Sequence, residues 1–146
     1  MAKVLFIGVL ILDQLIKYLV AAQMELGQSK VVIDGIFNIT YILNPGAAFG
    51  ILANQRAFFV LAGLVIIGVF VANYRRLRQY GTAFFYGGVS LIAGAVGNLI
   101  DRVRLGCVID FLDLRVWPIF NLVDIAIVLG VSFMMYSILF TMKETE

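Results

Sequence analysis

Long apolar stretches account for most of the chain, each close to the roughly 20 residues that a helix needs to cross the hydrocarbon core of a bilayer. The first contains Asp13, Gln14 and Lys17 and is followed by no small-residue cleavage pattern, so we interpret it as a retained helix rather than a signal peptide. The pattern predicts an all-α membrane fold with four transmembrane helices, at about residues 4–22, 57–74, 82–100 and 122–140.

Two longer segments, 23–56 and 101–121, connect these helices on one side of the membrane. In the first, Asp34-Gly35 lies between apolar runs and predicts a small β-hairpin, which leads into a turn at 44–50 that contains Pro and Gly. The second mixes charged and apolar residues and places Trp117 at headgroup depth, which indicates interfacial structure. We therefore expect one integral membrane domain, residues 1–146, with a hairpin or cradle and an interfacial segment on one face.

The composition restricts the chemistry. The 146 residues are 62% hydrophobic and include no histidine, which excludes Ser-His and Cys-His nucleophilic pairs and an HExxH zinc site. One cysteine, Cys107, allows neither an internal disulfide nor a thiolate metal cage, and we expect it to be inert. The net charge of +2 is scattered, so we expect no nucleic-acid partner. Hydrolysis would depend on Asp, Ser, Lys or Tyr, with no metal or cofactor.

The orientation depends on the short turn between the second and third helices. Positive residues number five on each side: Lys3, Arg75, Arg76, Arg78 and Lys143 on the side of the termini, and Lys30, Arg56, Arg102, Arg104 and Arg115 on the other. Because short loops weigh most in the positive-inside rule, the cluster at Arg75–Arg78 predicts that both termini are cytoplasmic. The two long segments then lie on the outer, periplasmic face.

Polar residues within the helices gather toward that outer face. A central Asp or Lys costs roughly 2.5–3.5 kcal/mol on insertion scales, so such residues indicate a functional site. In an up-and-down bundle, odd-numbered helices end where even-numbered helices begin. The residues that this arrangement brings together are Asp13, Lys17, Asn98, Asp101, Asn121 and Asp124. They form pairs at helical spacing, i and i+4 or i and i+3, so each pair shares a helix face.

A second carboxylate is expected beside Asp124. Asp124 lies 14 positions after Asp110, and Pro118 between them allows the chain to fold back. Two carboxylates that lie close together share a proton, so one can act as general base on a water while the other polarises a carbonyl. This is the chemistry of aspartyl peptidases. Asp113, in the same segment, is expected to be a solvated loop residue.

Other roles remain open at this point. Asp13 with Lys17 fits a structural ion pair better than catalysis, and Asn98 and Asn121 would equally well join helices by hydrogen bonds. The run 93–97 of Ala and Gly favours close helix packing.

Three further functions compete with the peptidase. A non-enzymatic membrane assembly factor would explain the close helix packing but not the set of buried carboxylates. A transporter or proton-conducting protein could use the intramembrane carboxylates as a relay, although the second helix and the cytoplasmic halves are almost entirely apolar. A Ser/Lys peptidase built on Lys17 would need a serine at the same depth, and Ser90 and Ser132 lie well inside their helices.

Five short motifs occur along nearly the whole chain: Asp13-Gln14-x-x-Lys17, Asn44-x-Gly46-Ala47-Ala48-Phe49, Gly97-Asn98-x-x-Asp101-Arg102, Val108-Ile109-Asp110-Phe111 and Phe120-Asn121-x-x-Asp124. Their order and spacing closely resemble the type II, or prolipoprotein, signal peptidases of bacteria. One departure is Val123, where the family usually has Ala; the extra bulk would alter packing beside Asp124 without removing a functional group.

The resemblance implies an aspartyl endopeptidase of the bacterial inner membrane, with its active site toward the outer face and Asp110 and Asp124 as the catalytic pair. It implies that further residues shape the site and hold substrate: Asp13, Lys17, Asn44, Gly46, Asn98, Asp101, Arg102 and Asn121. The implied substrate is a prolipoprotein with a diacylglyceryl group on its cysteine, cut just before that cysteine. Membrane lipid and a globomycin-like inhibitor are the other implied partners, and a monomer is sufficient.

Overall fold

The computed structural model describes residues 1–46 and 51–141. Within these ranges, four helical segments are long and apolar enough to cross a membrane, as predicted. A short 3₁₀ turn at Arg78–Tyr80 joins the second to the third, and a π-helical turn at Ser137–Thr141 extends the last. The helices are α1 (Ala2–Gln23), α2 (Arg56–Leu77), α3 (Thr82–Leu105) and α4 (Leu122–Tyr136).

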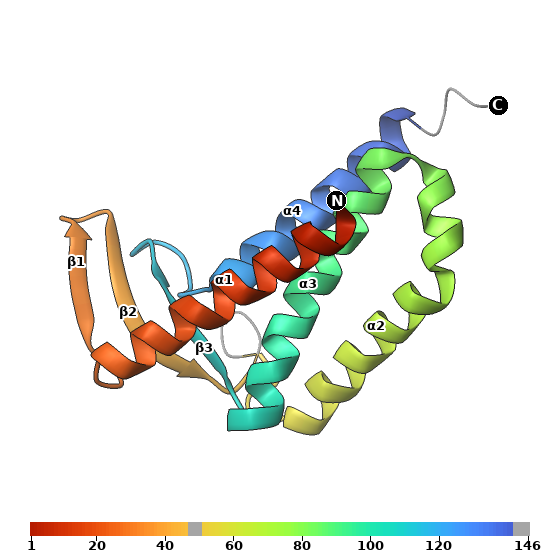
Figure 1. The fold of residues 1–146 in the computed structure, drawn as a ribbon. Helices are drawn as coiled ribbons and strands as arrows, with labels where there is room; N and C mark the ends of the chain where they lie inside the picture. Colours follow the sequence, from red (N-terminus) through yellow and green to blue (C-terminus); the bar gives the residue numbers. More distant parts are fainter. Residues whose placement is uncertain (47–50, 142–146) are drawn as a thin grey trace.

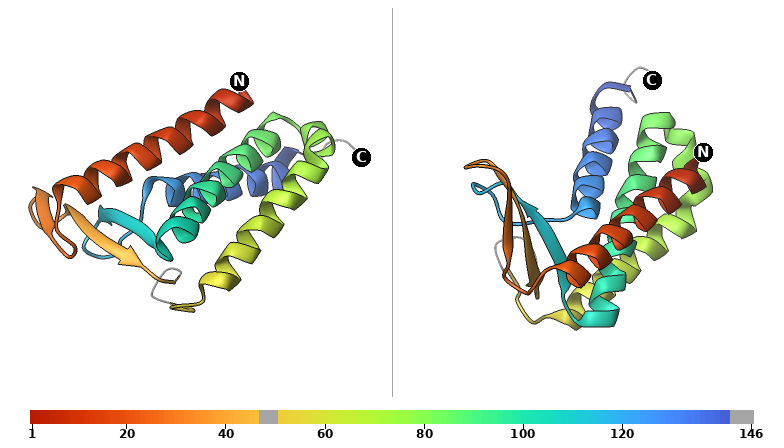
Figure 2. Two further views of the ribbon diagram at one scale, coloured as in Figure 1. Left: turned by 60° about the horizontal axis from the view of Figure 1, so that its bottom comes forward. Right: turned by 60° about the vertical axis from the view of Figure 1, so that its left-hand side comes forward.

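Helix α3 is the centre of the bundle and packs against α1, α2 and α4 (Figures 1 and 2). Its contact with α4 is very close at Gly94, where a β-carbon would lie 2.6 Å from the carbonyl oxygen of Val123 and would also meet Ile127. A side chain at this position would push the two helices apart. The Ala and Gly run at 93–97 is therefore a helix-packing surface, as its small residues predicted.

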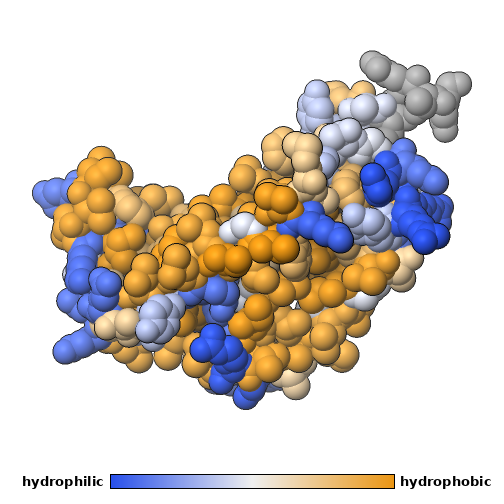
Figure 3. Space-filling view, in the orientation of Figure 1, coloured by the Kyte–Doolittle hydropathy of each residue, from blue (hydrophilic) through white to orange (hydrophobic). Residues whose placement is uncertain are grey.

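The outward faces of the helices are apolar (Figure 3). On α2, which has no buried residue, Val65, Val69 and Val71 are each more than half exposed. In water, so much apolar surface would drive aggregation, whereas in a bilayer it contacts lipid and the helices satisfy their own backbone hydrogen bonds. The chain is accordingly a multi-pass membrane protein.

A small antiparallel sheet lies at one end of the bundle (Figure 1). Its order in the described ranges is β1 (Ser29–Ile33), β2 (Phe37–Asn44) and β3 (Val108–Asp113). The predicted hairpin is present as β1–β2, but its loop has three residues, 34–36, rather than two. Gly35 adopts a φ of 69°, in the left-handed region that glycine tolerates.

The third strand was not predicted. β3 comes from the segment expected to be interfacial, and it pairs with β2 in a register that places Asp110 opposite Ile42 and Val108 opposite Asn44. Nearly every residue of β3 is buried, on both faces, so the alternation that marks a half-buried strand is absent.

The end of α1 packs on the sheet through Val20 and Met24, which form an apolar core with Phe111 of β3. This contact fixes the sheet against the end of the bundle where the polar residues lie. The N-terminus and the end of the last described helix lie at the opposite end (Figure 1). The predicted turn at 44–50 falls partly outside the described residues, as does Lys143.

Candidate active site

Asp110 is held by amide donors from two directions. It lies on β3, is 1% exposed, and accepts hydrogen bonds from Asn121 Nδ2 on Oδ1 at 2.7 Å and from Asn44 Nδ2 on Oδ2 at 2.9 Å. Asn44 in turn accepts from the backbone N–H of Gly46 at 3.0 Å, which fixes its amide. Both carboxylate oxygens of Asp110 are therefore oriented by neutral side chains.

Asp124 is fixed by the first turn of α4. The Asn121 side chain accepts a hydrogen bond from the Asp124 N–H at 3.0 Å, and the Asn121 N–H donates to Asp124 Oδ2 at 3.2 Å, which forms a reciprocal capping box. The other oxygen, Oδ1, accepts from Asn98 Nδ2 on α3 at 2.8 Å. The i, i+3 spacing seen in the sequence is thus a helix-capping relationship.

Asn121 connects the two carboxylates. Its side chain is fully buried; the amide donates to Asp110 and to Asn98 Oδ1, while its oxygen caps α4 beside Asp124. Asp110 and Asp124 line one pocket of about 280 Å³, between the sheet and the ends of α3 and α4 that lie nearest to it. The sequence prediction that the chain folds back to bring these two residues to one place agrees with this geometry.

The protonation of Asp110 is set mainly by its burial. The pKa of this carboxyl is raised from 3.8 to about 6: burial and, less strongly, the nearby Asp124 carboxylate raise it, while the hydrogen bonds from Asn44 and Asn121 and the charge of Lys17 lower it. A carboxyl group with this pKa holds a proton far more readily near neutral pH than an exposed one. The pair is therefore suited to share a proton.

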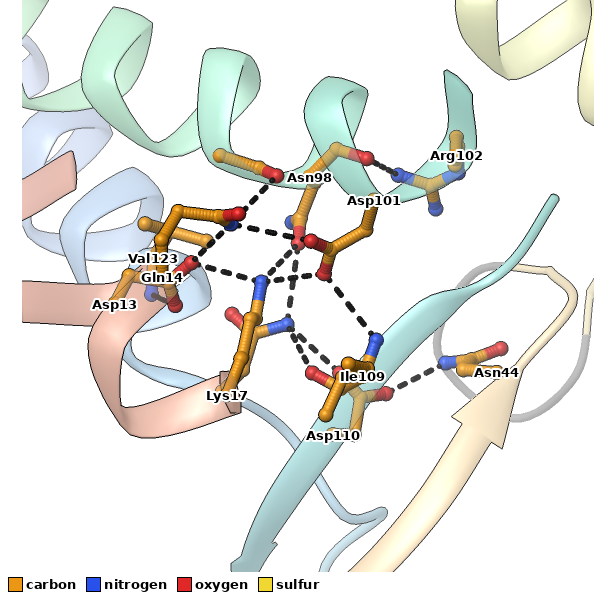
Figure 4. Close-up of polar contacts among 12 residues, drawn as sticks. Asp13, Gln14, Lys17, Asn44, Asn98, Asp101, Arg102, Ile109, Asp110 and Val123 are labelled. Atoms are coloured by element: carbon orange, nitrogen blue, oxygen red, sulfur yellow. Dashed lines mark hydrogen bonds and ion pairs between the residues drawn. The ribbon is translucent and has the colours of Figure 1, made fainter. Parts of the chain in front are cut away.

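Beneath the pocket, Lys17 is buried between two carboxylates (Figure 4). Its Nζ lies 2.9 Å from Asp13 Oδ2 and 2.8 Å from Asp101 Oδ2, and the Asn98 side-chain oxygen lies 3.5 Å away. The Asp13–Lys17 pair predicted from i, i+4 spacing is present, and Asp101 from α3 extends it to a triad.

The triad also holds the two segments that carry the pocket carboxylates. Asp101 Oδ2 accepts a hydrogen bond from the N–H of Ile109, the residue before Asp110, at 3.2 Å. Asp13 Oδ1 accepts from the N–H of Val123, the residue before Asp124, at 3.3 Å. The buried triad therefore joins α1 and α3 to β3 and α4 at the positions next to the pair.

Among the described residues, no group of three or more His, Cys, Asp or Glu side chains is placed to hold a metal ion. The chemistry that this arrangement supports is proton transfer to and from a bound molecule by two carboxyl groups at the wall of a partly apolar pocket.

Comparison with known proteins assigns the chain to a family. The family model described as signal peptidase (SPase) II matches residues 5–140. The chain belongs to the signal peptidase II family. It is therefore a peptidase, and the transporter alternative receives no support.

Individual relatives are similar to this chain over most of its length and of theirs. A lipoprotein signal peptidase of Moorella thermoacetica is 43% identical over 136 residues, which cover 93% of this chain and 91% of the relative. One of Geobacter sulfurreducens is 47% identical, over 86% of this chain and 83% of the relative. A solved structure described as a bacterial membrane enzyme superposes with a TM-score of 0.93 at 34% identity, over 99% of this chain and 91% of that one. A second gives a TM-score of 0.87 at 35% identity, over 96% and 93%.

The residues expected to form the signal peptidase site divide into two layers. Six of them line the pocket: Asn44, Gly46, Asn98, Arg102, Asp110 and Asp124. The other four lie beneath or behind it, where they hold the pocket residues: Asp13, Lys17, Asp101 and Asn121. Because these four residues do not line the pocket, they are better placed to hold the segments that carry the pocket residues than to contact a substrate.

Gln14 was not among the expected site residues although it lies in one of the motifs. Its Nε2 donates to Asp101 Oδ1 at 3.1 Å and to Asp13 Oδ2 at 3.2 Å, so it bridges the two carboxylates of the buried triad. The sequence signal that could have indicated this role is its position between Asp13 and Lys17, two charged residues within an apolar helix. Trp117, expected at headgroup depth, lines the pocket, a position that spacing alone does not indicate.

The expectation for Asp113 was wrong. It is buried, not solvated, and accepts hydrogen bonds from Thr40 Oγ1 at 2.8 Å and from the Arg115 N–H at 2.9 Å. Thr40 also lies 2.8 Å from Ser29 Oγ on β1. Asp113 thus anchors a polar ladder across the sheet, which forms only because β3 pairs with β2.

Proposed function

We propose that this protein is a lipoprotein signal peptidase that cuts diacylglyceryl-modified prolipoproteins just before the lipidated cysteine, with Asp110 and Asp124 as its catalytic pair. Membership of the family and the names of the relatives support the reaction. The observation that carries the residue assignment is that two carboxylates, one on β3 and one on α4, line one pocket and are joined through Asn121.

In the proposed mechanism, the reactive form of the enzyme carries the shared proton on Asp110, while Asp124 is ionised. Asp124 removes a proton from a water as the water oxygen attacks the peptide carbonyl carbon, while Asp110 donates its proton to the carbonyl oxygen. In the second step the C–N bond breaks, Asp124 returns its proton to the leaving nitrogen, and Asp110 recovers one from a hydroxyl of the intermediate. The raised pKa of Asp110 supports this assignment of the proton.

The surroundings of the pocket suit a lipid-anchored substrate. Ile127 and Val128 of α4 line the pocket, and Val128 is 63% exposed on the lipid-facing side of the helix. An acyl chain attached near the scissile bond would therefore remain in an apolar environment while the peptide reaches the carboxylates. We infer that the β1–β2 hairpin covers the bound lipopeptide and limits entry of water.

The proposed topology places both termini in the cytoplasm and the pocket toward the outer leaflet. It is supported by the cluster at Arg75–Arg78, which lies at the end of the bundle opposite the sheet. One domain and a monomer are sufficient for the chemistry. The pocket between the two carboxylates is also the proposed site for a globomycin-like inhibitor.

Cleavage of a diacylglyceryl-modified prolipoprotein by purified protein tests the proposal. Asp110→Asn and Asp124→Asn should each lower kcat by several orders of magnitude while remaining folded, because each removes one proton-transfer group. Asp34→Asn, in the exposed hairpin turn, controls for the chemical change. Ser90→Ala, whose hydroxyl donates to the Ala126 carbonyl oxygen, controls for a serine mechanism. Normal cleavage by either pocket variant would refute the pair.

A further inference from the structure

Arg102 lies beside the two pocket carboxylates and is held by two carbonyl oxygens. It lines the same pocket as Asp110 and Asp124. Its Nη2 donates to the carbonyl oxygen of Gly46 at 2.9 Å, and its Nη1 lies 3.5 Å from the carbonyl oxygen of Asn98. Within residues 1–46 and 51–141, no carboxylate oxygen lies within 4.0 Å of the guanidinium. The cation therefore faces the carboxylates without a direct ion pair.

An aromatic ring lies against the same guanidinium. The central carbon of Arg102 lies 4.6 Å from the centroid of the Phe59 ring, within the range of a cation–π contact. Phe59 comes from α2, a helix with no buried residue, yet Phe59 itself is half-buried. Through this ring, α2 contacts a residue that lines the pocket.

The contact has a consequence for the orientation of Arg102. An arginine side chain has many rotamers, and fixing it costs conformational entropy. The acceptors at Gly46 and Asn98 leave the plane of the guanidinium free to tilt, whereas a ring against its face restricts that tilt. The ring does so without bringing a charge or a hydrogen-bond acceptor into the site.

We propose that Phe59 is a positioning residue for the peptidase reaction and holds the Arg102 guanidinium at the pocket, facing the two carboxylates. The proposal rests on the proposed function of Asp110 and Asp124. A cation fixed there stabilises the negative charge that develops on the peptide carbonyl oxygen during attack. Without the ring, the cation retains its acceptors but loses its fixed orientation, so the loss falls on kcat rather than on KM.

The neighbouring Phe58 provides a matched control. It is 54% exposed on the same helix and meets Phe59 edge to face, with ring centroids 5.4 Å apart. We expect Phe59→Leu to lower kcat about tenfold, equivalent to about 1.4 kcal/mol, with KM changed by less than about twofold. Phe59→Tyr keeps the ring face and should retain activity, and Phe58→Leu should cleave like the unmodified protein. Equal effects of Phe59→Leu and Phe58→Leu would overturn the proposal.

A double-mutant cycle with Arg102 separates positioning from simple packing. If Phe59 acts through the guanidinium, Phe59→Leu causes no further loss of kcat in an Arg102→Gln background. Multiplying losses would show that Phe59 acts independently of Arg102, and would overturn the proposal. Should Phe59→Leu lower the unfolding temperature, Phe59→Met keeps the apolar bulk without a ring and takes its place in the cycle.

Asp110→Asn, assayed in parallel, distinguishes the two proposals. If Asp110→Asn cleaves normally, the proposed catalytic pair fails whatever happens at Phe59. If Asp110→Asn is inactive while Phe59→Leu matches Phe58→Leu, the catalytic pair stands and the positioning role alone fails.

Discussion

Asp110→Asn should make the protein more stable at neutral pH even though it abolishes cleavage. Asp110 is 1% exposed, and its carboxylate is held in a site where burial disfavours the charged form. The unfolded chain solvates the same carboxylate freely. Replacement by a neutral amide of similar shape removes this penalty from the folded state.

The magnitude follows from the pKa of Asp110, which burial raises from 3.8 to about 6. At 1.36 kcal/mol for each pKa unit, the ionised carboxyl destabilises the fold by about 3 kcal/mol. The new amide NH₂ faces the donor of Asn44 or Asn121, which loses one hydrogen bond worth about 1 kcal/mol. The net gain is about 2 kcal/mol, or a rise of about 4–8 °C in unfolding temperature for a chain of this size.

The sign of the pH dependence provides the sharper test. Because the folded state binds the Asp110 proton more tightly than the unfolded state, the stability of the unmodified protein falls as pH rises from about 4 to 6. The Asn variant lacks this titration. Its advantage should therefore be largest at pH 6 and above and should vanish below about pH 4.

Thermal unfolding in detergent micelles, followed by the fluorescence of the single tryptophan at the pocket, measures the difference at each pH. Asp34→Asn, in the exposed hairpin turn, is the matched control and should show no gain. A variant that is less stable than the unmodified protein at neutral pH would refute the reasoning, as would a gain that does not change with pH.

Two further substitutions test how the bundle is held together. Lys17→Met leaves two buried carboxylates without their cation and should destabilise the protein by about 3–5 kcal/mol, seen as a lower unfolding temperature; an unchanged temperature would contradict a paired triad. Gly94→Ala should destabilise by about 1–3 kcal/mol because its methyl group meets α4, whereas Gly68→Ala on α2 has open space and should be neutral or slightly stabilising. Equal effects of the two alanines would argue against the close α3–α4 contact.

The transmembrane helices were predictable because their signal is local. A run of about 20 apolar residues must form a helix in lipid, whatever its neighbours are, since each backbone group has to be paired within the segment. The same holds for the i, i+4 relation of Asp13 and Lys17, whereas Asn121, expected on one helix face with Asp124, instead precedes α4 as its N-cap. The Asp13–Lys17 pair required only the geometry of a single helix.

Partners that are distant in sequence depended on the tertiary structure. Lys17 on α1 forms an ion pair with Asp101 on α3. Asp113 is buried because its segment forms strand β3 and pairs with β2 rather than remaining a loop. No periodicity within either segment encodes such contacts, since they arise from how the bundle and the sheet pack. The five motifs predicted which residues gather at the site, but not which of them line the pocket.

The sequence by itself thus determined a four-helix membrane protein, the exclusion of histidine and thiolate chemistry, and an aspartate pair as the candidate for hydrolysis. The tertiary structure alone decided the third strand, the buried triad beneath the pocket, and the contact of Arg102 with Phe59. The physical reason is that hydropathy and helical spacing act over a few turns of chain. The orientation of a carboxylate or a guanidinium depends on donors, acceptors and rings that other segments supply.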